Sequence, residues 1–351
     1  MNKFLAEIME QPEAVEATLS YYLSDRGKRE LKNIRQMLEK ERPEQIIFTG
    51  MGSSYFASYA ASYLFNSMGI RSYAMNSSEL LYYHFPVIGR KTAVVCVSQS
   101  GESFEVVRLL EKLPKDILCI GVSNEAKSSL SMRAVTVLRS RAGREEMTST
   151  KTYTTITLVM FILGWYLGDA WGREKVRQIR RMCAGMEKML NRREKLIDDV
   201  KGFLGKVDFI QFIGRGPAFS TAVQSELMFK EAAKVAAAGT LGGEFRHGPM
   251  EMVGASFKSV LFAAEGKTYS QSIKMARDIG KYHGKVVLIS NKASLGANDE
   301  NVKTIAIDQP DEYLFSIQSI IPVQLLVNAL ALTNGHEPGR FLHGGKVTLT
   351  E

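Results

Sequence analysis

The chain has 351 residues, of which 45% are hydrophobic and 23% are charged. This length allows one long or two ordinary domains, and the composition excludes a small disulfide scaffold, a fibrous protein and a wholly disordered chain. The formal net charge is +8, from 45 Lys and Arg against 37 Asp and Glu. A positive excess indicates nucleic-acid binding only where it lines one face or groove, so its position in the chain matters.

The N-terminus and the most apolar stretch of the chain argue against export and a membrane span. The N-terminal fifteen residues carry three glutamates and no basic region leading into an apolar one, so they do not form a secretory signal. The most apolar stretch, residues 156–168, is shorter than the ~20 residues that cross a bilayer, and we expect a buried helix. The three cysteines, Cys96, Cys119 and Cys183, lack metal-ligand spacing. We expect a cytoplasmic protein with reduced cysteines, no metal and no cofactor.

The first half contains three apolar strand-like runs that each end in turn residues. Residues 46–49 lead into Gly50-Met51-Gly52-Ser53-Ser54 and a helical pattern. Residues 92–97 lead into a serine-rich loop, and residues 117–122 end in Ser123-Asn124. Strands that alternate with helical patterns favour a parallel sheet with helices on both faces.

Residues 173–206 hold most of the positive charge. They contain eleven basic and five acidic residues, and their apolar residues recur at helical spacing. The basic residues most simply form the solvated face of a helix, which we place as a linker at 169–199. A nucleic-acid surface is the alternative, and we expect no nucleic-acid partner.

The second half repeats the first. Residues 209–213 lead into Gly214-Arg215-Gly216-Pro217, residues 259–264 into Glu265-Gly266-Lys267, and residues 286–289 into Ser290-Asn291. The glycine pairs lie 164 residues apart and the Ser-Asn pairs 167 apart. Two copies of one α/β unit are predicted, at 35–168 and 200–333, with a C-terminal tail at 334–351.

Ligands of such sheets bind at the carboxyl ends of the strands. Neither glycine turn fits a dinucleotide fingerprint, because Tyr55 and Phe219 occupy the third glycine position. The loop Ser98-Gln99-Ser100-Gly101-Glu102-Ser103 suits a phosphate, since helix N–H groups and short hydroxyls can bind an anion together. An ordinary helix cap would use the same residue types.

The second copy lacks these serines and has other candidate residues. His247 stands beside Gly248-Pro249 in a glycine-rich stretch, where it can titrate near neutral pH or serve only a turn. Glu231 lies in an apolar, alanine-rich helical stretch, where a buried unpaired carboxylate would be costly. Either Lys230 or Lys234 pairs with it, or it lines a site.

Together these motifs resemble the tandem sugar isomerase (SIS) domains of glucosamine-6-phosphate synthase and its relatives. The resemblance covers nearly the whole chain, in order, and rests on several segments: residues 50–54, 98–103, Ser149-Thr150-Lys151, Lys230-Glu231, residues 244–249, Gly339-Arg340 and Lys346-Val347-Thr348. It implies two tandem SIS domains of α/β fold, at 35–168 and 200–333, with the tail returning to the active site.

The resemblance also implies roles for individual residues. Ser54, Ser98, Ser100 and Ser103 match hydroxyls that bind the sugar phosphate, with Ser53 and Gln99 beside them. Glu231 matches the base that moves a proton between carbons one and two. His247 matches the ring-opening histidine, which the neighbouring subunit supplies. Lys346 matches a tail lysine that lies at the sugar and can form an imine with its carbonyl; without the family it would be a solvated lysine near a mobile chain end.

Two departures from the synthase limit what the resemblance implies. Met228 replaces a synthase lysine, and the chain is too short to include the synthase's glutaminase half, so we expect no ammonia transfer from glutamine. The implied function is an enzyme acting on an amino-sugar phosphate, either a glucosamine-6-phosphate deaminase or a deglycase of sugar-amino acid 6-phosphates. A plain aldose/ketose-phosphate isomerase and a non-catalytic sugar-phosphate sensor are the alternatives. The implied partners are a phosphorylated sugar and a second copy of the chain, as a homodimer or higher homo-oligomer.

Overall fold

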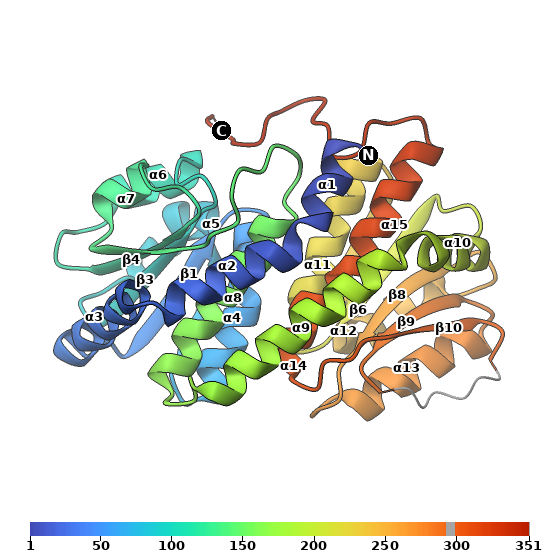
Figure 1. The fold of residues 1–351 in the computed structure, drawn as a ribbon, viewed down its shortest axis with the longest axis horizontal. Coiled ribbons are helices and arrows are strands. Elements are labelled where there is room, and N and C mark those ends of the chain that lie inside the picture. The colour runs from blue at the N-terminus through green and yellow to red at the C-terminus, as the bar shows by residue number, and fades with distance from the viewer. Residues whose placement is uncertain (293–298, 351) are drawn as a thin grey trace. The chain divides into compact units, whose positions relative to one another are not determined.

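The structure, a computed structural model, describes residues 1–292 and 299–350 and divides into two compact units (Figure 1). The β1–β5 unit comprises Glu13–Arg177 and Leu342–Glu351, and the β6–β10 unit comprises Met1–Pro12 and Gln178–Phe341. Each unit therefore contains one copy of the repeat and a segment from the opposite end of the chain.

The β1–β5 unit is built on a parallel sheet of strand order β2-β1-β3-β4-β5. Its strands are β1 (Gln45–Gly50), β2 (Ser72–Asn76), β3 (Thr92–Val97), β4 (Leu118–Ser123) and β5 (Thr136–Arg139). Its helices are α2 (Gln11–Leu23, which starts in the other unit), α3 (Asp25–Glu41), α4 (Ser53–Ser67), α5 (Ser77–Tyr82), η1 (Phe85–Val87), α6 (Phe104–Lys112), α7 (Ser129–Arg133) and α8 (Lys151–Leu167).

Side chains alternate between the two faces of this sheet. On one face Ile47 packs in a buried cluster with Leu80 of α5 and Leu109 of α6. On the other, Phe48 meets Phe65 of α4 edge to face, with ring centroids 4.9 Å apart. Helices therefore cover both faces, as the sequence predicts.

The β6–β10 unit repeats this plan, with strand order β10-β9-β8-β6-β7, all parallel. Its strands are β6 (Phe209–Gly214), β7 (Ala236–Leu241), β8 (Lys258–Ala263), β9 (Lys285–Ser290) and β10 (Val302–Ala306). Its helices are α1 (Lys3–Met9), α9 (Arg173–Asn191, which starts in the other unit), α10 (Arg193–Leu204), α11 (Ala218–Met228), η2 (Phe229–Ala233), α12 (Gly242–Arg246), η3 (Pro249–Met252), α13 (Tyr269–Lys281), α14 (Glu312–Gln318) and α15 (Ile320–Thr333).

The first strand of each unit ends in a glycine on which the next helix packs. A Cβ added at Gly50 would lie 2.9 Å from the Cβ of Ser54 in α4, and one at Gly214 would lie 2.4 Å from the Ala218 carbonyl oxygen in α11. Any side chain there would force strand and helix apart. The repeated glycines thus allow α4 and α11 to begin close to the ends of β1 and β6.

Three segments differ from the sequence expectations or add to them. The basic segment forms two helices, α9 and α10, rather than one. The apolar stretch near residue 160 forms the buried helix α8, as predicted. Among the described residues one other stretch, Glu312–Thr333, is long and apolar enough to cross a membrane, but 94% of its most apolar 18-residue window is buried inside the protein, as in a core helix.

Candidate active site

The loop after β3 carries four of the residues expected to bind phosphate. Ser98 is buried, while Gln99, Ser100 and Ser103 are half-buried. The Ser98 hydroxyl accepts a hydrogen bond from the Gly101 amide at 3.0 Å and lies 3.2 Å from the Ser103 hydroxyl. The chain therefore folds back so that its hydroxyls gather just before α6.

The start of α6 distinguishes this loop from an ordinary helix cap. Ser103 occupies the N-cap position, yet its side chain makes no capping hydrogen bond. Its hydroxyl remains in the loop beside that of Ser98. The amide of Phe104, the first residue of α6, donates to the carbonyl oxygen of Thr348 in the C-terminal tail at 3.0 Å. The tail therefore lies directly against the end of the serine loop.

The glycine turn after β1 contributes the two other hydroxyls. Gly52 precedes α4 with a positive φ of 50°, and Ser53 and Ser54 open the helix. Ser54 is buried and Ser53 is half-buried. Because β1 and β3 are parallel neighbours, this turn and the serine loop lie next to each other at the carboxyl ends of the strands.

A buried carboxylate stands at the start of α8, in the Ser149-Thr150-Lys151 region. Glu145 Oε1 accepts from the Thr150 amide at 2.9 Å, the Thr150 hydroxyl at 3.0 Å and the Thr152 amide at 3.1 Å. Glu145 Oε2 accepts from the Thr152 hydroxyl at 2.5 Å. Glu145 thus caps α8 from outside the helix, a role its sequence position between Arg144 and Glu146 does not indicate.

The tail lysine meets this carboxylate. Lys346 Nζ forms an ion pair with Glu145 Oε2 and donates a hydrogen bond to the Met147 carbonyl oxygen at 2.7 Å. The Glu145 side chain is fully buried and that of Lys346 is 20% exposed. Through Lys346 the tail is therefore bonded to the same unit that carries the serine loop.

In the β6–β10 unit, Glu231 lies on a distorted helical turn. Residues Phe229–Ala233 form the π-helix η2, which directly follows α11 and is closed by Lys234 in the left-handed conformation, with φ 56°. Single π-turns of this kind are frequent at functional sites. The buried Met228, which replaces the synthase lysine, is the last residue of α11.

The two lysines beside Glu231 bind other groups. Lys230 forms an ion pair with Glu226, whose other oxygen accepts from the Gly239 amide at 2.8 Å. Lys234 Nζ donates to the backbone carbonyl of Glu231 and to that of Arg340, the latter at 2.9 Å.

His247 lies on the surface of the same unit. The stretch expected to be a glycine-rich loop is instead strand β7 followed by the short helix α12, and His247 is the C-cap of that helix. Its backbone amide donates to Glu244 at 3.0 Å, while its side chain is exposed. The neighbouring Arg246 pairs with Asp278 at 2.8 Å, which fixes the end of the helix to α13.

The predicted site residues therefore fall into two groups. The serines, Gln99 and Lys346 belong to the β1–β5 unit, whereas Glu231 and His247 belong to the β6–β10 unit. Among the described residues, no group of three or more His, Cys, Asp or Glu is placed to hold a metal ion.

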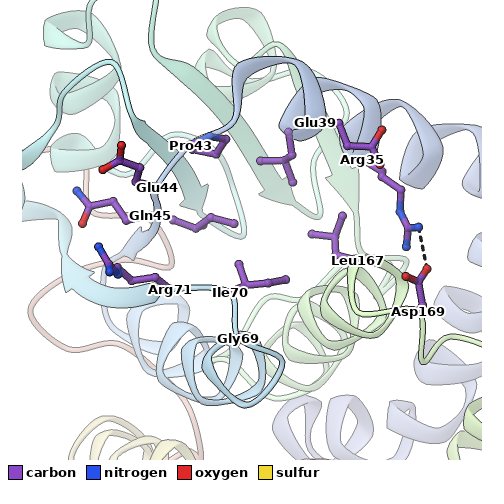
Figure 2. A pocket seen from close by; sticks show the side chains of 12 residues that line it. Arg35, Glu39, Pro43, Glu44, Gln45, Gly69, Ile70, Arg71, Leu167 and Asp169 are labelled. Carbon is purple, nitrogen blue, oxygen red and sulfur yellow. Dashed lines mark ion pairs between the residues drawn. The ribbon is translucent and has the colours of Figure 1, made fainter.

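A pocket of about 680 Å³ in the β1–β5 unit lies at the other end of the strands (Figure 2). Gln45 and Ile46 at the start of β1, and Arg71 just before β2, line it, together with the ion pair of Arg35 and Asp169 at 2.7 Å. Because ligands of parallel sheets bind at the carboxyl ends of the strands, this pocket is not the candidate active site.

Both sheets match one family model, the SIS domain, at residues 37–164 and 204–334. The chain belongs to the SIS domain family. The two parallel sheets with flanking helices confirm the predicted tandem pair of SIS domains.

Curated SIS relatives align with nearly all of this chain. The isomerizing glutamine–fructose-6-phosphate aminotransferase of Pyrococcus horikoshii is 30% identical over 345 residues, which are 96% of this chain and 56% of the relative. The same enzyme of Thermococcus kodakarensis is 28% identical over 349 residues, 96% of this chain and 56% of the relative. The chain thus spans about half the length of these relatives.

Solved SIS structures share the fold. The C-terminal domain of glucosamine-fructose-6-phosphate aminotransferase from Francisella tularensis has a TM-score of 0.86 at 22% identity, covering 95% of this chain and 96% of that one. Glucosamine-6-phosphate deaminase from Thermotoga maritima has a TM-score of 0.79 at 19% identity, covering 98% and 99%. A tagatose-6-phosphate ketose/aldose isomerase structure from Clostridium novyi has a TM-score of 0.84 at 22% identity, covering 99% and 93%.

Proposed function

We propose that this protein is a cytoplasmic enzyme that acts on a hexose 6-phosphate bearing nitrogen at carbon one or two. Two activities fit this description: the deamination of glucosamine 6-phosphate and the cleavage of a sugar-amino acid 6-phosphate by a deglycase. The names of the SIS relatives, which refer to phosphorylated sugars or their amino derivatives, support the substrate class.

The observation that carries the proposal is the serine loop. Its hydroxyls gather at the start of α6, where Ser103 makes no capping bond of its own, and backbone N–H groups at a helix start favour an anion. Ser98, Ser100 and Ser103 bind the phosphate in the proposed complex, with Gln99 beside them and Ser53 and Ser54 on the adjacent turn. Hydroxyl donors provide this binding without a cation that would also attract other anions.

The chemistry in the proposed complex is ring opening followed by proton transfer, which leaves a C=N bond that one water molecule hydrolyses to a sugar carbonyl and free ammonia or amino acid. His247, an exposed imidazole with both a donor and an acceptor nitrogen, moves the proton between the ring oxygen and the anomeric hydroxyl. Glu231, ionised, takes the proton from one of carbons one and two and returns it to the other. Lys346 reaches the sugar carbonyl from the tail. His247 serves the site of a neighbouring subunit, so the active form is at least a dimer.

One experiment tests the proposal. The purified protein is incubated separately with glucosamine 6-phosphate and with fructosyl-amino acid 6-phosphates, and released ammonia or amino acid is measured. Turnover of either class supports the proposal and separates deaminase from deglycase. Tagatose 6-phosphate and fructose 6-phosphate test plain isomerisation, and fructose 6-phosphate with glutamine tests glutamine-dependent amination. Binding of these phosphates without any turnover would indicate a sensor instead.

A further inference from the structure

The ion pair between Glu145 and Lys346 joins two segments 201 residues apart. A fully buried carboxylate is costly unless its oxygens are satisfied and its charge is balanced. Thr150 and Thr152 supply four hydrogen bonds from the start of α8. In the described part of the chain, Lys346 is the cation recorded in an ion pair with it.

The tail is held at two further points. Lys346 Nζ donates to the Met147 carbonyl at 2.7 Å, and the Thr348 carbonyl accepts from the Phe104 amide at 3.0 Å. The second of these bonds lies at the residue that directly follows Ser103. The ion pair between Lys346 and Glu145 therefore fixes the position of the tail beside the serine loop. An ammonium group has three N–H donors, and the recorded contacts of Lys346 use two of them.

We propose that Glu145 is a positioning residue, which anchors the tail beside the serine loop and holds Lys346 as an ammonium that donates its third N–H to the substrate carbonyl oxygen. The hydrogen bond from Lys346 to the substrate rests on the proposed function, whereas the anchoring of the tail by Glu145 does not.

This role differs from that of an imine-forming lysine. To attack a carbonyl carbon, the nitrogen must first lose a proton and expose its lone pair. That loss would leave the buried Glu145 carboxylate without its counter-charge, or would place the proton on Glu145 and weaken the cap of α8. As an ammonium, Lys346 keeps the pair intact and stabilises negative charge that develops on the carbonyl oxygen during proton transfer between carbons one and two.

The anchoring is tested by hydrogen exchange and mass spectrometry on the full chain, without substrate. Glu145→Gln and Lys346→Met should each increase exchange at least about tenfold at the Phe104 amide, which donates to the Thr348 carbonyl oxygen. Lys346→Met also leaves the buried Glu145 carboxylate without its counter-charge, so exchange at the start of α8 should increase as well. Glu146→Gln is the matched control, since this neighbouring carboxylate is exposed and pairs with Arg144 at 3.2 Å. Equal protection of the Phe104 amide in Glu145→Gln and Glu146→Gln would overturn the anchoring role.

The charge role is tested by turnover of the substrate that the ammonia and amino acid assays identify. Arginine keeps the positive charge and its donors but cannot form an imine, so Lys346→Arg should retain at least about a tenth of the activity, and Lys346→Met should retain far less. In the Lys346→Met background, Glu145→Gln should not change KM further, because Glu145 acts through the lysine. Lys346→Arg as inactive as Lys346→Met, or a substrate adduct on Lys346 after borohydride reduction, would overturn this role. The exchange experiment needs no turnover, so failure of the proposed function is distinguishable from failure of the anchoring.

Discussion

In both SIS copies the first strand ends in a glycine that the next helix approaches closely, and both sheets have the same strand order relative to that strand. The loops after the strands differ between the copies. After β3 stands a loop of hydroxyl residues, whereas after β8, at the equivalent place, stands Glu265-Gly266-Lys267. The scaffold is repeated with its glycines but not with its polar residues. The proposed function divides the chemistry accordingly: the first copy binds the phosphate and the second supplies the acid and base.

The carboxylates of the two copies are also held differently. Glu145 is fully buried and accepts hydrogen bonds from threonines on both oxygens. Glu231 is half-buried on a π-turn. A carboxylate saturated with donors is suited to hold a structure in place, whereas a more accessible one is suited to exchange protons.

The largest effect on activity is expected when Glu231 is replaced. Glu231→Gln should lower kcat by about 10²- to 10⁴-fold, because the amide cannot accept the proton from carbon one or two. KM should change little, since the phosphate is bound by the other copy. Steady-state kinetics measure both values, and Glu251→Gln, an exposed carboxylate of the same unit, is the control. A Glu231→Gln variant with nearly full kcat would exclude it as the base.

The second effect concerns the sharing of sites between subunits. Glu231→Gln and His247→Ala should each be nearly inactive, and mixing them under exchange should restore about a quarter of the wild-type sites, because random pairing makes half the dimers mixed, with one intact site each. Activity before and after mixing is measured, with exchange verified by differently labelled subunits. No recovery despite complete exchange would show that His247 serves its own chain.

The third effect is on binding by the serine loop. Ser100→Ala should raise KM about ten- to a hundredfold, because a hydrogen bond to a charged group contributes about 1.5–3 kcal/mol. The thermal unfolding midpoint should stay near that of the wild type. Thr268→Ala is the matched control: Thr268 is the N-cap of α13 after β8, and its side chain makes no capping bond. Equal KM values for the two variants would remove the loop from the site.

The sequence predicts the central strands better than the edge strands. The runs at β1, β3, β4, β6, β8 and β9 are apolar and almost wholly buried, so they stand out without reference to any neighbour. The strands β2, β5, β7 and β10, which lie at the sheet edges, mix buried residues with half-buried or exposed ones. They become strands because a neighbour pairs with them, and a single local pattern does not contain that information.

The candidate site shows the same limit. The serine loop is recognisable because all of its polar residues are consecutive. Glu145 sits in the charged run Arg144-Glu145-Glu146, which is typical of an exposed segment, and its partner Lys346 is distant in the sequence. The π-turn at Glu231 also has no sequence signal, since its residues fit a continuous α-helix. Only the folded chain brings such features together.

The smallest expected effect concerns Glu312, an acidic residue at the loops of the second copy. Its carboxylate lies where a Cβ at Gly266 would come within 3.0 Å, and burial raises its pKa above the ordinary value of 4.5, opposed by Lys267 and aided by Asp311. The folded state therefore keeps the proton at pH values where the unfolded state has lost it. The free energy of unfolding must then fall as pH rises through that window.

Glu312→Gln cannot titrate and should escape this loss. Relative to the wild type, its free energy of unfolding should increase between about pH 4.5 and about pH 7.5, by less than about 1 kcal/mol because the carboxylate is only half-buried. Urea unfolding at both pH values measures the difference, with Glu251→Gln as the control. The opposite result would be a wild-type free energy of unfolding that increases relative to that of the variant as pH rises. It would mean that Lys267 and the start of α14 hold Glu312 as a carboxylate. The second copy would then also offer an anchored negative charge at its loops, as the first does at Glu145.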